Sequence, residues 1–307
     1  MFDTVNFWID RAELSGVSPF DVLHCLSEIT ERQNDRGYSC TGKAGDYTVN
    51  VYETGISLKG SLAKNYYGDN LHTLRRWEVK QAIEQLSDNL HIDIGTAKIN
   101  RLDVSTIIQT KRPPSDYYGY LGSKPHFERL QSTPDTLYYN NNQRQIIFYD
   151  KTREATATGV EIPEILQNSN LFRYELRYIK RLNKQLKTDL TAAKLYDVEF
   201  YRSVIGSWYN EFKAIQKIKK QSFMIDNINT VKEAETALFA SLLQQAGQSG
   251  IDEFVNDLKA QKRFGSRSDY TKLRADLNKM AVAKNGNKSD LIKELETAIF
   301  NIARYAR

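Results

Sequence analysis

The pattern of hydrophobic and polar residues changes its period near residue 190. Before this position, several segments alternate between apolar and polar residues, as half-buried β-strands do. Two strands joined at Thr54-Gly55 are expected within residues 46–60, and four more at 98–108, 135–140, 144–150 and 171–179. Two helices are expected among them, at 18–32 after a Ser18-Pro19 start and at 73–90. The second carries one apolar side, formed by Leu74, Trp77, Ile83 and Leu86.

Beyond residue 190 the spacing becomes helical. Apolar residues recur every three or four positions at Val198, Tyr201, Val204, Trp208, Phe212 and Ile215. Further helices are expected at 230–247, 251–261, 268–285 and 289–306, the first opened by a capping box of Thr230 and Glu233 and ending near Gly247. The sequence therefore predicts an α+β domain with an antiparallel sheet over residues 1–220, followed by a helical domain over 221–307.

Strand parity sorts the polar side chains of three strands, because successive residues point to opposite faces of a sheet. Leu102 and Val104 fall on one face, and Phe172, Tyr174 and Leu176 do the same in their strand. The opposite face then collects Asp103, Glu175, Tyr149 and Lys151, with Arg101, Arg173 and Arg177 at its edges. Other tyrosines, such as Tyr174 and Tyr178, lie on the apolar side of their strand.

This combination of side chains suits phosphoryl transfer. Two carboxylates can hold a hard divalent cation such as Mg²⁺ or Mn²⁺ beside a phosphodiester. A tyrosine phenol can then act as the nucleophile, and a nearby lysine can stabilise the phenolate or bind the phosphate. The residues alone leave a second interpretation open, in which these are ordinary polar groups on the solvated side of a half-buried sheet.

Charge is concentrated in one segment of the chain. The net charge of the 307 residues is +5, whereas residues 173–220 contain twelve lysines and arginines against five acids. Such a segment is either a solvated helix face or a surface that binds a nucleic-acid backbone. A basic, aromatic stretch at 57–71, with Lys59, Lys64, Tyr66 and Tyr67, either contacts DNA backbone and bases or is a plain hairpin and loop.

Several classes of protein are disfavoured. No apolar run is long enough to cross a bilayer, and the acidic N-terminus is unlike an export signal. Two cysteines in 307 residues are typical of a reducing cytoplasm. The four histidines show no metal-ligand spacing, and no phosphate-binding loop of the Gly-x-x-x-x-Gly-Lys type is present.

Three segments together resemble a known family. INRLDVS at 99–105, QIIFYDKTRE at 145–154 and LFRYELRYIKRLNKQL at 171–186 are similar to the gene II/X family of phage and plasmid replication proteins. The shared pattern is Arg-hydrophobic-Asp, then Tyr-x-Lys-x-x-Glu, then Arg-aromatic-Glu. The resemblance runs from near residue 1 to about residue 217.

The resemblance implies a rolling-circle replication initiator. Such an enzyme nicks one strand of origin DNA, stays bound to the 5′ phosphate through a tyrosine, and later closes the displaced strand. Carried over by position, Tyr149 is the nucleophile, Lys151 supports the phosphate or the phenol, and Asp103, Glu175 and Glu154 are candidate ligands of Mg²⁺ or Mn²⁺. The cations expected to bind DNA are Arg101, Arg173, Arg177, Lys180, Arg181, Lys184 and Lys187. The chain lacks the His-hydrophobe-His metal motif of better-known nickases.

The resemblance also indicates where the protein would work and with what. The partner is origin DNA, double-stranded and single-stranded, in the cytoplasm of a bacterial host, with no membrane involved. For the C-terminal helices, origin binding, self-association as a homodimer and recruitment of a host helicase or DNA polymerase all stay open. The competing hypothesis is a DNA-binding replication or regulatory factor without cleavage activity. Convergence of Asp103, Glu175 and Tyr149 would favour the enzyme.

Overall fold

The computed structural model describes residues 1–35, 37–218, 229–282 and 290–306. The chain forms two compact units, one of Met1–Ile218 together with Glu294–Arg307 and the other of Lys219–Lys293. The first unit contains all the candidate site residues.

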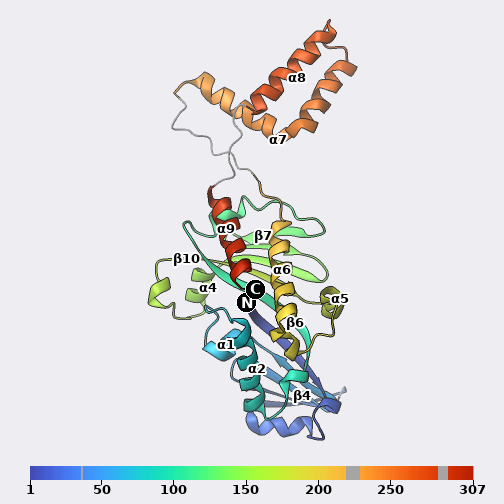
Figure 1. The fold of residues 1–307 in the computed structure, drawn as a ribbon, viewed down its shortest axis with the longest axis vertical. Coiled ribbons are helices and arrows are strands. Elements are labelled where there is room, and N and C mark those ends of the chain that lie inside the picture. Colours follow the sequence, from blue (N-terminus) through green and yellow to red (C-terminus); the bar gives the residue numbers. More distant parts are fainter. Residues whose placement is uncertain (36, 219–228, 283–289, 307) are drawn as a thin grey trace. The chain divides into compact units, whose positions relative to one another are not determined.

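A single antiparallel sheet forms the framework of the first unit (Figure 1). Its strand order in the described chain is β2-β3-β4-β5-β1-β6-β10-β9-β8-β7, so that the N-terminal strand and β6 lie in the middle. The bounds are β1 Phe2–Asp10, β2 Ser27–Asn34, β3 Gly37–Ala44, β4 Tyr47–Tyr52, β5 Gly55–Lys59, β6 Lys98–Thr110, β7 Glu128–Thr133, β8 Thr136–Asn140, β9 Arg144–Asp150 and β10 Asn170–Tyr178. The six strands expected within 46–60 and at 98–179 are all present.

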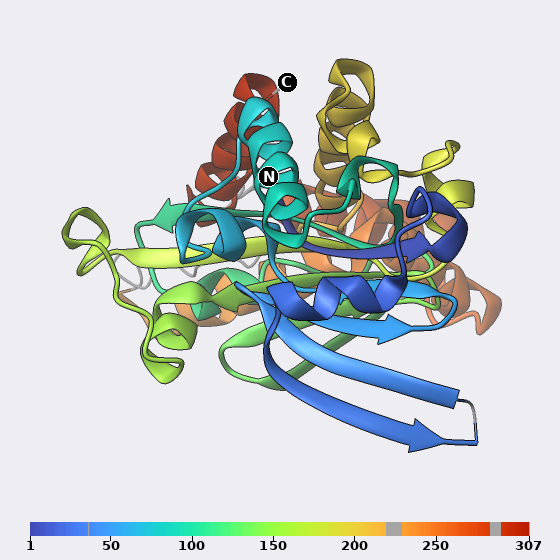
Figure 2. The same cartoon turned by 90° about the horizontal axis from the view of Figure 1, so that it is seen from below.

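Helices cover one face of this sheet. Figure 2 shows α2 (Arg76–Leu90), α6 (Val198–Lys213) and α9 (Asp290–Tyr305) on the same side. The predicted stripe of α6 is buried from Tyr201 onward, and the ring of Trp208 stacks on Tyr174 of β10 with centroids 4.6 Å apart. Shorter helices are α1 Leu62–Tyr67, α3 Ser115–Tyr118, α4 Lys151–Ala157 and α5 Leu182–Leu186, with 3-10 turns at Arg11–Glu13, Pro19–Cys25, Ile94–Thr96, Glu164–Leu166 and Ala192–Tyr196.

The second unit is helical. Its helices α7 (Val231–Ala260) and α8 (Arg267–Val282) pack through Ile251, Val255, Tyr270 and Leu277. The sequence predicted two helices here, ending near Gly247 and starting at 251, but α7 continues through both positions. In the described parts of the chain, no helix combines the length and the apolar character that crossing a bilayer requires.

The predicted helix over 18–32 is wrong beyond Cys25. A 3-10 turn occupies Pro19–Cys25, opened by the Ser18 side chain, and residues 27–34 then pair with β3 as a strand. The apolar spacing that favoured a helix ends at Leu26, and pairing with β3 decides the remainder. In α2, Trp77 is 51% exposed because the buried side of the helix is formed by other residues, Val79, Ala82, Ile83, Leu86 and Leu90.

The C-terminal helix belongs mostly to a different unit from the one that the sequence predicted. The sequence placed everything from 221 to 307 in one helical domain, whereas residues from Glu294 onward belong to the first unit. The carboxylate of Glu294 accepts hydrogen bonds from the backbone N–H of Lys111 and from the hydroxyl of Tyr117, at 2.9 Å each. Helical periodicity identified α9 but carries no information about which surface the apolar side covers.

Replacing Ile299 by alanine should therefore destabilise the first unit. This side chain is fully buried on α9, and truncation of a buried isoleucine costs about 2–5 kcal/mol. Urea unfolding followed by tryptophan fluorescence reports on this unit, because Trp8, Trp77 and Trp208 all lie in it. The exposed neighbour Asn301→Ala is the matched control and should leave the transition in place. An unchanged transition in Ile299→Ala would show that α9 does not stabilise the sheet.

Candidate active site

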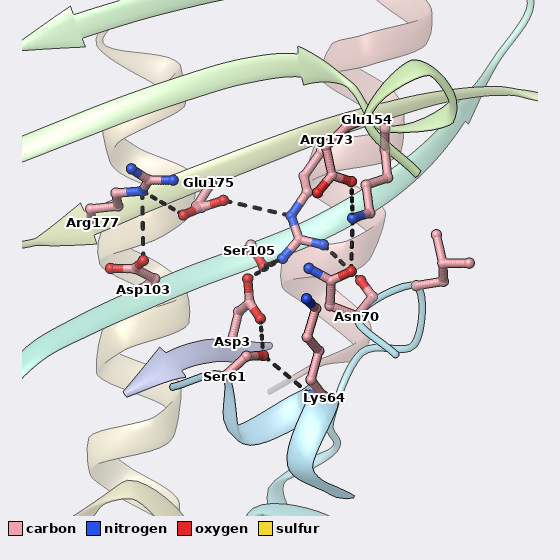
Figure 3. A network of polar contacts seen from close by, with 12 residues as sticks. Asp3, Ser61, Lys64, Asn70, Asp103, Ser105, Glu154, Arg173, Glu175 and Arg177 are labelled. Atoms are coloured by element: carbon pink, nitrogen blue, oxygen red, sulfur yellow. Dashed lines mark hydrogen bonds and ion pairs between the residues drawn. The ribbon is translucent and has the colours of Figure 1, made fainter. Parts of the chain in front are cut away.

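Strand register brings the predicted polar residues to one face of the sheet. Tyr149 of β9 lies directly opposite Arg173 of β10, and Asp103 of β6 lies opposite Arg177. Glu175 lies opposite Ser105 on one side and Ile147 on the other. Directly opposite residues in antiparallel strands share a face, so strand parity correctly placed Tyr149, Asp103 and Glu175 on one face. Figure 3 shows the Asp103, Glu175 and Arg173 side chains on the near face, with helices behind the sheet.

A buried guanidinium lies at the centre of this face (Figure 3). Arg173 is 2% exposed, and its Nη2 donates to a carboxylate oxygen of Asp3 and, at 2.8 Å, to the hydroxyl of Ser105. Its Nη1 donates to the backbone carbonyl of Asn70 at 2.7 Å, and its Nε is 3.6 Å from Glu175. Burial opposes the charged form, but the surrounding acids outweigh it and raise the pKa of Arg173 above its usual value.

Tyr149 lies beside this guanidinium. The centre of the Arg173 guanidinium is 6.0 Å from the centroid of the tyrosine ring, within the range of a cation–π contact. Burial raises the pKa of the phenol, Arg173 lowers it, and the charges of Glu175 and Glu154 raise it further. The net shift is upward, so the phenol is neutral at physiological pH and must lose its proton to act as a nucleophile.

The carboxylates of Asp103 and Glu175 share one cation. Nε of Arg177 is 2.6 Å from Glu175 and 3.5 Å from Asp103. Asp103 is fully buried and also accepts two hydrogen bonds from Arg101, at 3.0 and 2.6 Å. Burial raises the pKa of Asp103 to about 7, against the lowering effect of Arg101, and the charge of Glu175 raises it too.

Lys151 reaches the site from a helix instead of the strand on which it was expected. β9 ends at Asp150, whose side chain accepts a hydrogen bond from the backbone N–H of Arg153 and so caps α4. Lys151 is the first residue of α4 and is fully buried. Its Nζ donates to the side-chain carbonyl of Asn70 at 2.7 Å and pairs with Glu154. Burial lowers the pKa of this lysine, and Glu154 partly offsets the effect.

The predicted metal ligands fall into two groups. Asp103 and Glu175 fit a cation, because both already contact the same nitrogen of Arg177. Glu154 is engaged with Lys151 instead. Within the residues that the structure describes, no three acidic, histidine or cysteine side chains form a group that could hold a metal ion. Two carboxylates, completed by water and a phosphate oxygen, are therefore the donor set that this face offers.

Sequence reasoning missed two groups that hold the site together. Asp3 is 6% exposed and also accepts a 2.6 Å hydrogen bond from Ser61. Asn70 contacts both Arg173 and Lys151, the first through its backbone and the second through its side chain. No local motif marks either residue, since both contacts join segments far apart in sequence. Lys64 extends from α1 toward Asn70 (Figure 3), in the stretch that the sequence had singled out as basic and aromatic.

The predicted DNA-binding cations divide by exposure. Four of them lie exposed on and around α5, namely Lys180, Arg181, Lys184 and Lys187. Arg101 and Arg177 are half-buried and paired with Asp103 and Glu175. Arg173 is enclosed among protein groups and is not part of an exposed basic surface.

The chain was also compared with known proteins. The model of one protein family, described as the N-terminal part of a phage replication-associated protein of the gene II type, matches residues 1–204. No curated protein matches the chain. The matched region is most of the first unit and includes Asp103, Tyr149, Lys151 and Glu175. The resemblance to gene II replication proteins is thereby confirmed, and the chain belongs to this family of phage replication-associated proteins.

Proposed function

We propose that this phage replication-associated protein initiates rolling-circle replication by nicking one strand of origin DNA through Tyr149. The observation that carries the proposal is the strand register, which places Tyr149 opposite Arg173 and diagonal to Glu175 on one polar face. A diagonal neighbour on an adjacent strand lies roughly 7–8 Å away. A DNA phosphate beside Tyr149 therefore meets a nucleophile, a guanidinium and a carboxylate at once.

The proposed reaction is a transfer of the phosphoryl group between two oxygens. The Oη of Tyr149 forms a bond to phosphorus while the bond from phosphorus to the 3′ oxygen breaks. The phenol gives up its proton, the departing 3′ oxygen takes one up as a hydroxyl, and the 5′ end stays linked to the protein. The same steps in reverse join a 3′ hydroxyl to the linked strand, because the phosphotyrosine conserves the energy of the phosphodiester.

Two cations support this transfer. The guanidinium of Arg173 favours the phenolate of Tyr149, since its charge lowers the pKa of the phenol. The ammonium of Lys151 is held by Asn70 and Glu154 and can donate to a phosphate oxygen. Both groups are buried and fixed by several contacts, so they need little rearrangement during the reaction.

Asp103 and Glu175 would hold the divalent cation, Mg²⁺ or Mn²⁺. When bound, such an ion polarises the phosphodiester and stabilises the charge that develops on it. Binding DNA is assigned to the exposed cations around α5, where each neutralised phosphate releases counterions. The protein would act on origin DNA in the cytoplasm of a bacterial host.

Two observations favour the second hypothesis, a DNA-binding replication factor without cleavage activity. Asp103 is two strands away from Tyr149 and four residues along β6 from Ile107, which faces Arg173. Strand spacings then separate the Cα atoms of Asp103 and Tyr149 by roughly 15 Å. Asp103 and Glu175 are also already neutralised by arginines. Such a protein would bind the origin without forming a covalent adduct.

Changing Tyr149 to phenylalanine distinguishes the two hypotheses. The variant should form no covalent adduct with a single-stranded oligonucleotide from the DNA flanking the gene, because it lacks the attacking oxygen. Binding of the same oligonucleotide should stay within about twofold, since one hydroxyl is lost. Denaturing gel electrophoresis after incubation with Mg²⁺ or Mn²⁺ measures the adduct.

The matched control is Tyr138→Phe. Tyr138 lies on β8 opposite Ile147, so it shares the polar face and is the neighbouring candidate nucleophile. This variant should form the adduct normally. An adduct that persists in Tyr149→Phe and disappears in Tyr138→Phe would transfer the chemistry to Tyr138. No adduct from the unmodified protein with either metal, despite intact DNA binding, would favour the non-catalytic hypothesis.

Replacing Asn70 by alanine should slow adduct formation roughly 10- to 150-fold. The change removes the hydrogen bond to the charged Lys151, of a kind worth about 1.5–3 kcal/mol, and keeps the backbone carbonyl that binds Arg173. Asn65→Ala is the control from the same segment, because Asn65 accepts a backbone hydrogen bond from Asp46 and does not touch Lys151. If both variants slowed adduct formation equally, Asn70 would act only by supporting the fold of this segment and not by positioning Lys151.

Metal dependence tests the carboxylate pair. A chelator should abolish the adduct and leave DNA binding intact, and Mg²⁺ or Mn²⁺ should restore it. Asp103→Asn should weaken Mn²⁺ binding, measured by calorimetry or electron paramagnetic resonance, by at least about tenfold. Glu84→Gln on the exposed side of α2 is the control for loss of one acid. Unchanged Mn²⁺ affinity in Asp103→Asn would place the metal elsewhere.

A further inference from the structure

The polar face of the sheet continues beyond the candidate site. In one row across the sheet, register pairs Lys43 of β3 with Thr48 of β4, and Thr48 with Lys59 of β5. A second row runs from Asn50 through Ser57 to Trp8 of β1. A third pairs Tyr52 with Gly55. Lys59 and Tyr52 are exposed, and Lys43 and Trp8 are half-exposed, so this part of the face is open to solvent.

The two faces of this half of the sheet differ in charge. β3, β4 and β5 contain no acidic residue, and both of their lysines, Lys43 and Lys59, lie on the polar face. Glu31 of β2 lies opposite the buried Cys40 and thus on the other face. At the end of β1, the carboxylate of Asp10 is paired with Lys98. The open face is therefore cationic, which suits a polyanion.

Aromatic rings lie beside the lysines. The rings of Trp8 and Tyr52 are 6.2 Å apart between centroids and tilted by 38°. Tyr52, the last residue of β4, is 38% exposed. Trp8 lies opposite Ser57, two residues along β5 from Lys59, so the row of Trp8 is roughly 7 Å from the lysine row, and Tyr52 lies one row farther on. Cations beside exposed rings are the combination that binds single strands, with phosphates on the cations and bases on the rings.

This surface leads directly to the candidate site. Lys59 is two residues before Ser61, whose hydroxyl donates to Asp3 in the Arg173 network. On the other side, Asn6 of β1 pairs with Arg101 of β6, and Arg101 contacts Asp103. The row of Lys43 and Lys59 and the polar residues around Tyr149 are thus joined by neighbouring polar side chains on the same continuous sheet.

We propose that the open face of β3, β4, β5 and β1 binds single-stranded DNA on its way to Tyr149, with Lys43 and Lys59 on phosphates and Tyr52 and Trp8 under bases. This inference rests on the proposed function and adds a second DNA surface to the exposed cations around α5. Its position on the sheet sets the direction from which the strand enters the site.

The test measures affinity for single-stranded DNA in a protein that cannot form the proposed tyrosine adduct. All variants are made in the Tyr149→Phe background, and the probe is an oligothymidylate of about 20 nucleotides, long enough to span both surfaces. Affinity is measured by fluorescence anisotropy over a series of salt concentrations. Lys43→Ala with Lys59→Ala should reduce the slope of log affinity against log salt by about 1.4, at roughly 0.7 for each phosphate contact on a single strand. Tyr52→Ala should weaken binding about tenfold with little change in slope.

Matched controls come from α2, which lies on the opposite side of the sheet. Lys80→Ala removes an exposed lysine and Trp77→Ala removes a ring that is 51% exposed. Both should leave affinity and slope unchanged, and thermal unfolding of all variants should agree. Equal affinities for the sheet variants and the α2 variants would overturn the inference.

The binding test of this sheet face and the adduct test of Tyr149 can fail independently. A reduced slope in the lysine variant, together with no adduct from the protein with an intact Tyr149, would keep the DNA surface and remove the nicking activity. Unchanged binding in the sheet variants, together with a normal adduct from the protein with an intact Tyr149, would keep the nicking activity and remove the DNA surface. A loss of duplex binding without loss of oligothymidylate binding would also contradict the inference, because it would assign this face to double-stranded DNA.

Discussion

The structure depends on burying the positive charge of Arg173 in the middle of a sheet. An isolated charge in such a position is strongly unfavourable, and it is tolerated only when paired and hydrogen-bonded. Asp3, Ser105 and Asn70 accept hydrogen bonds from the two Nη atoms of this guanidinium, and they come from three separate parts of the chain. The contacts tie the first strand, the central strand β6 and the segment after α1 to β10. Removing Asp3 would take away the carboxylate that is hydrogen-bonded to this buried charge, so fold and site depend on the same interaction.

Arg173 also bears on the proposed role of Tyr149, because its guanidinium lies beside the ring of this phenol. A half-buried phenol has a raised pKa and is a poor nucleophile unless a cation lies near it. Arg173 is that cation, and it cannot move away because its other hydrogen bonds hold it. The sheet therefore supplies the charge in advance, which is the arrangement expected of a site that stabilises a developing phenolate.

Local alternation predicted which side chains share a face of the sheet, whereas contacts between distant segments could not be predicted from it. Parity placed Tyr149, Glu175 and Asp103 on one face because the period of a strand fixes side-chain direction. Parity does not give distance along the face, so the sequence could not separate Glu175, which is diagonal to Tyr149, from Asp103, which lies farther away. Asp3 and Asn70 were missed because their partners are 170 and 81 residues distant, as the Asp3–Arg173 and Asn70–Lys151 bonds show. Residues 27–34 became a strand for a similar reason, since pairing with β3 outweighed the local pattern.

The charges on the polar face balance one another, so a phosphate bound there would need a further cation. The acids Asp3, Asp103, Glu154 and Glu175 are matched in the described structure by Arg101, Arg173, Arg177 and Lys151. A DNA phosphate that enters this neutral cluster adds a negative charge in a region of low dielectric, where uncompensated charge is costly. Under the proposed function, compensation would come from a further cation, either a metal ion held by Asp103 and Glu175 or the lysines on the adjoining sheet face. A neutral resting site thus disfavours entry of any anion without such a cation, so under the proposed function the surroundings of the cluster would be as important for recognising DNA as Tyr149 for reacting with it.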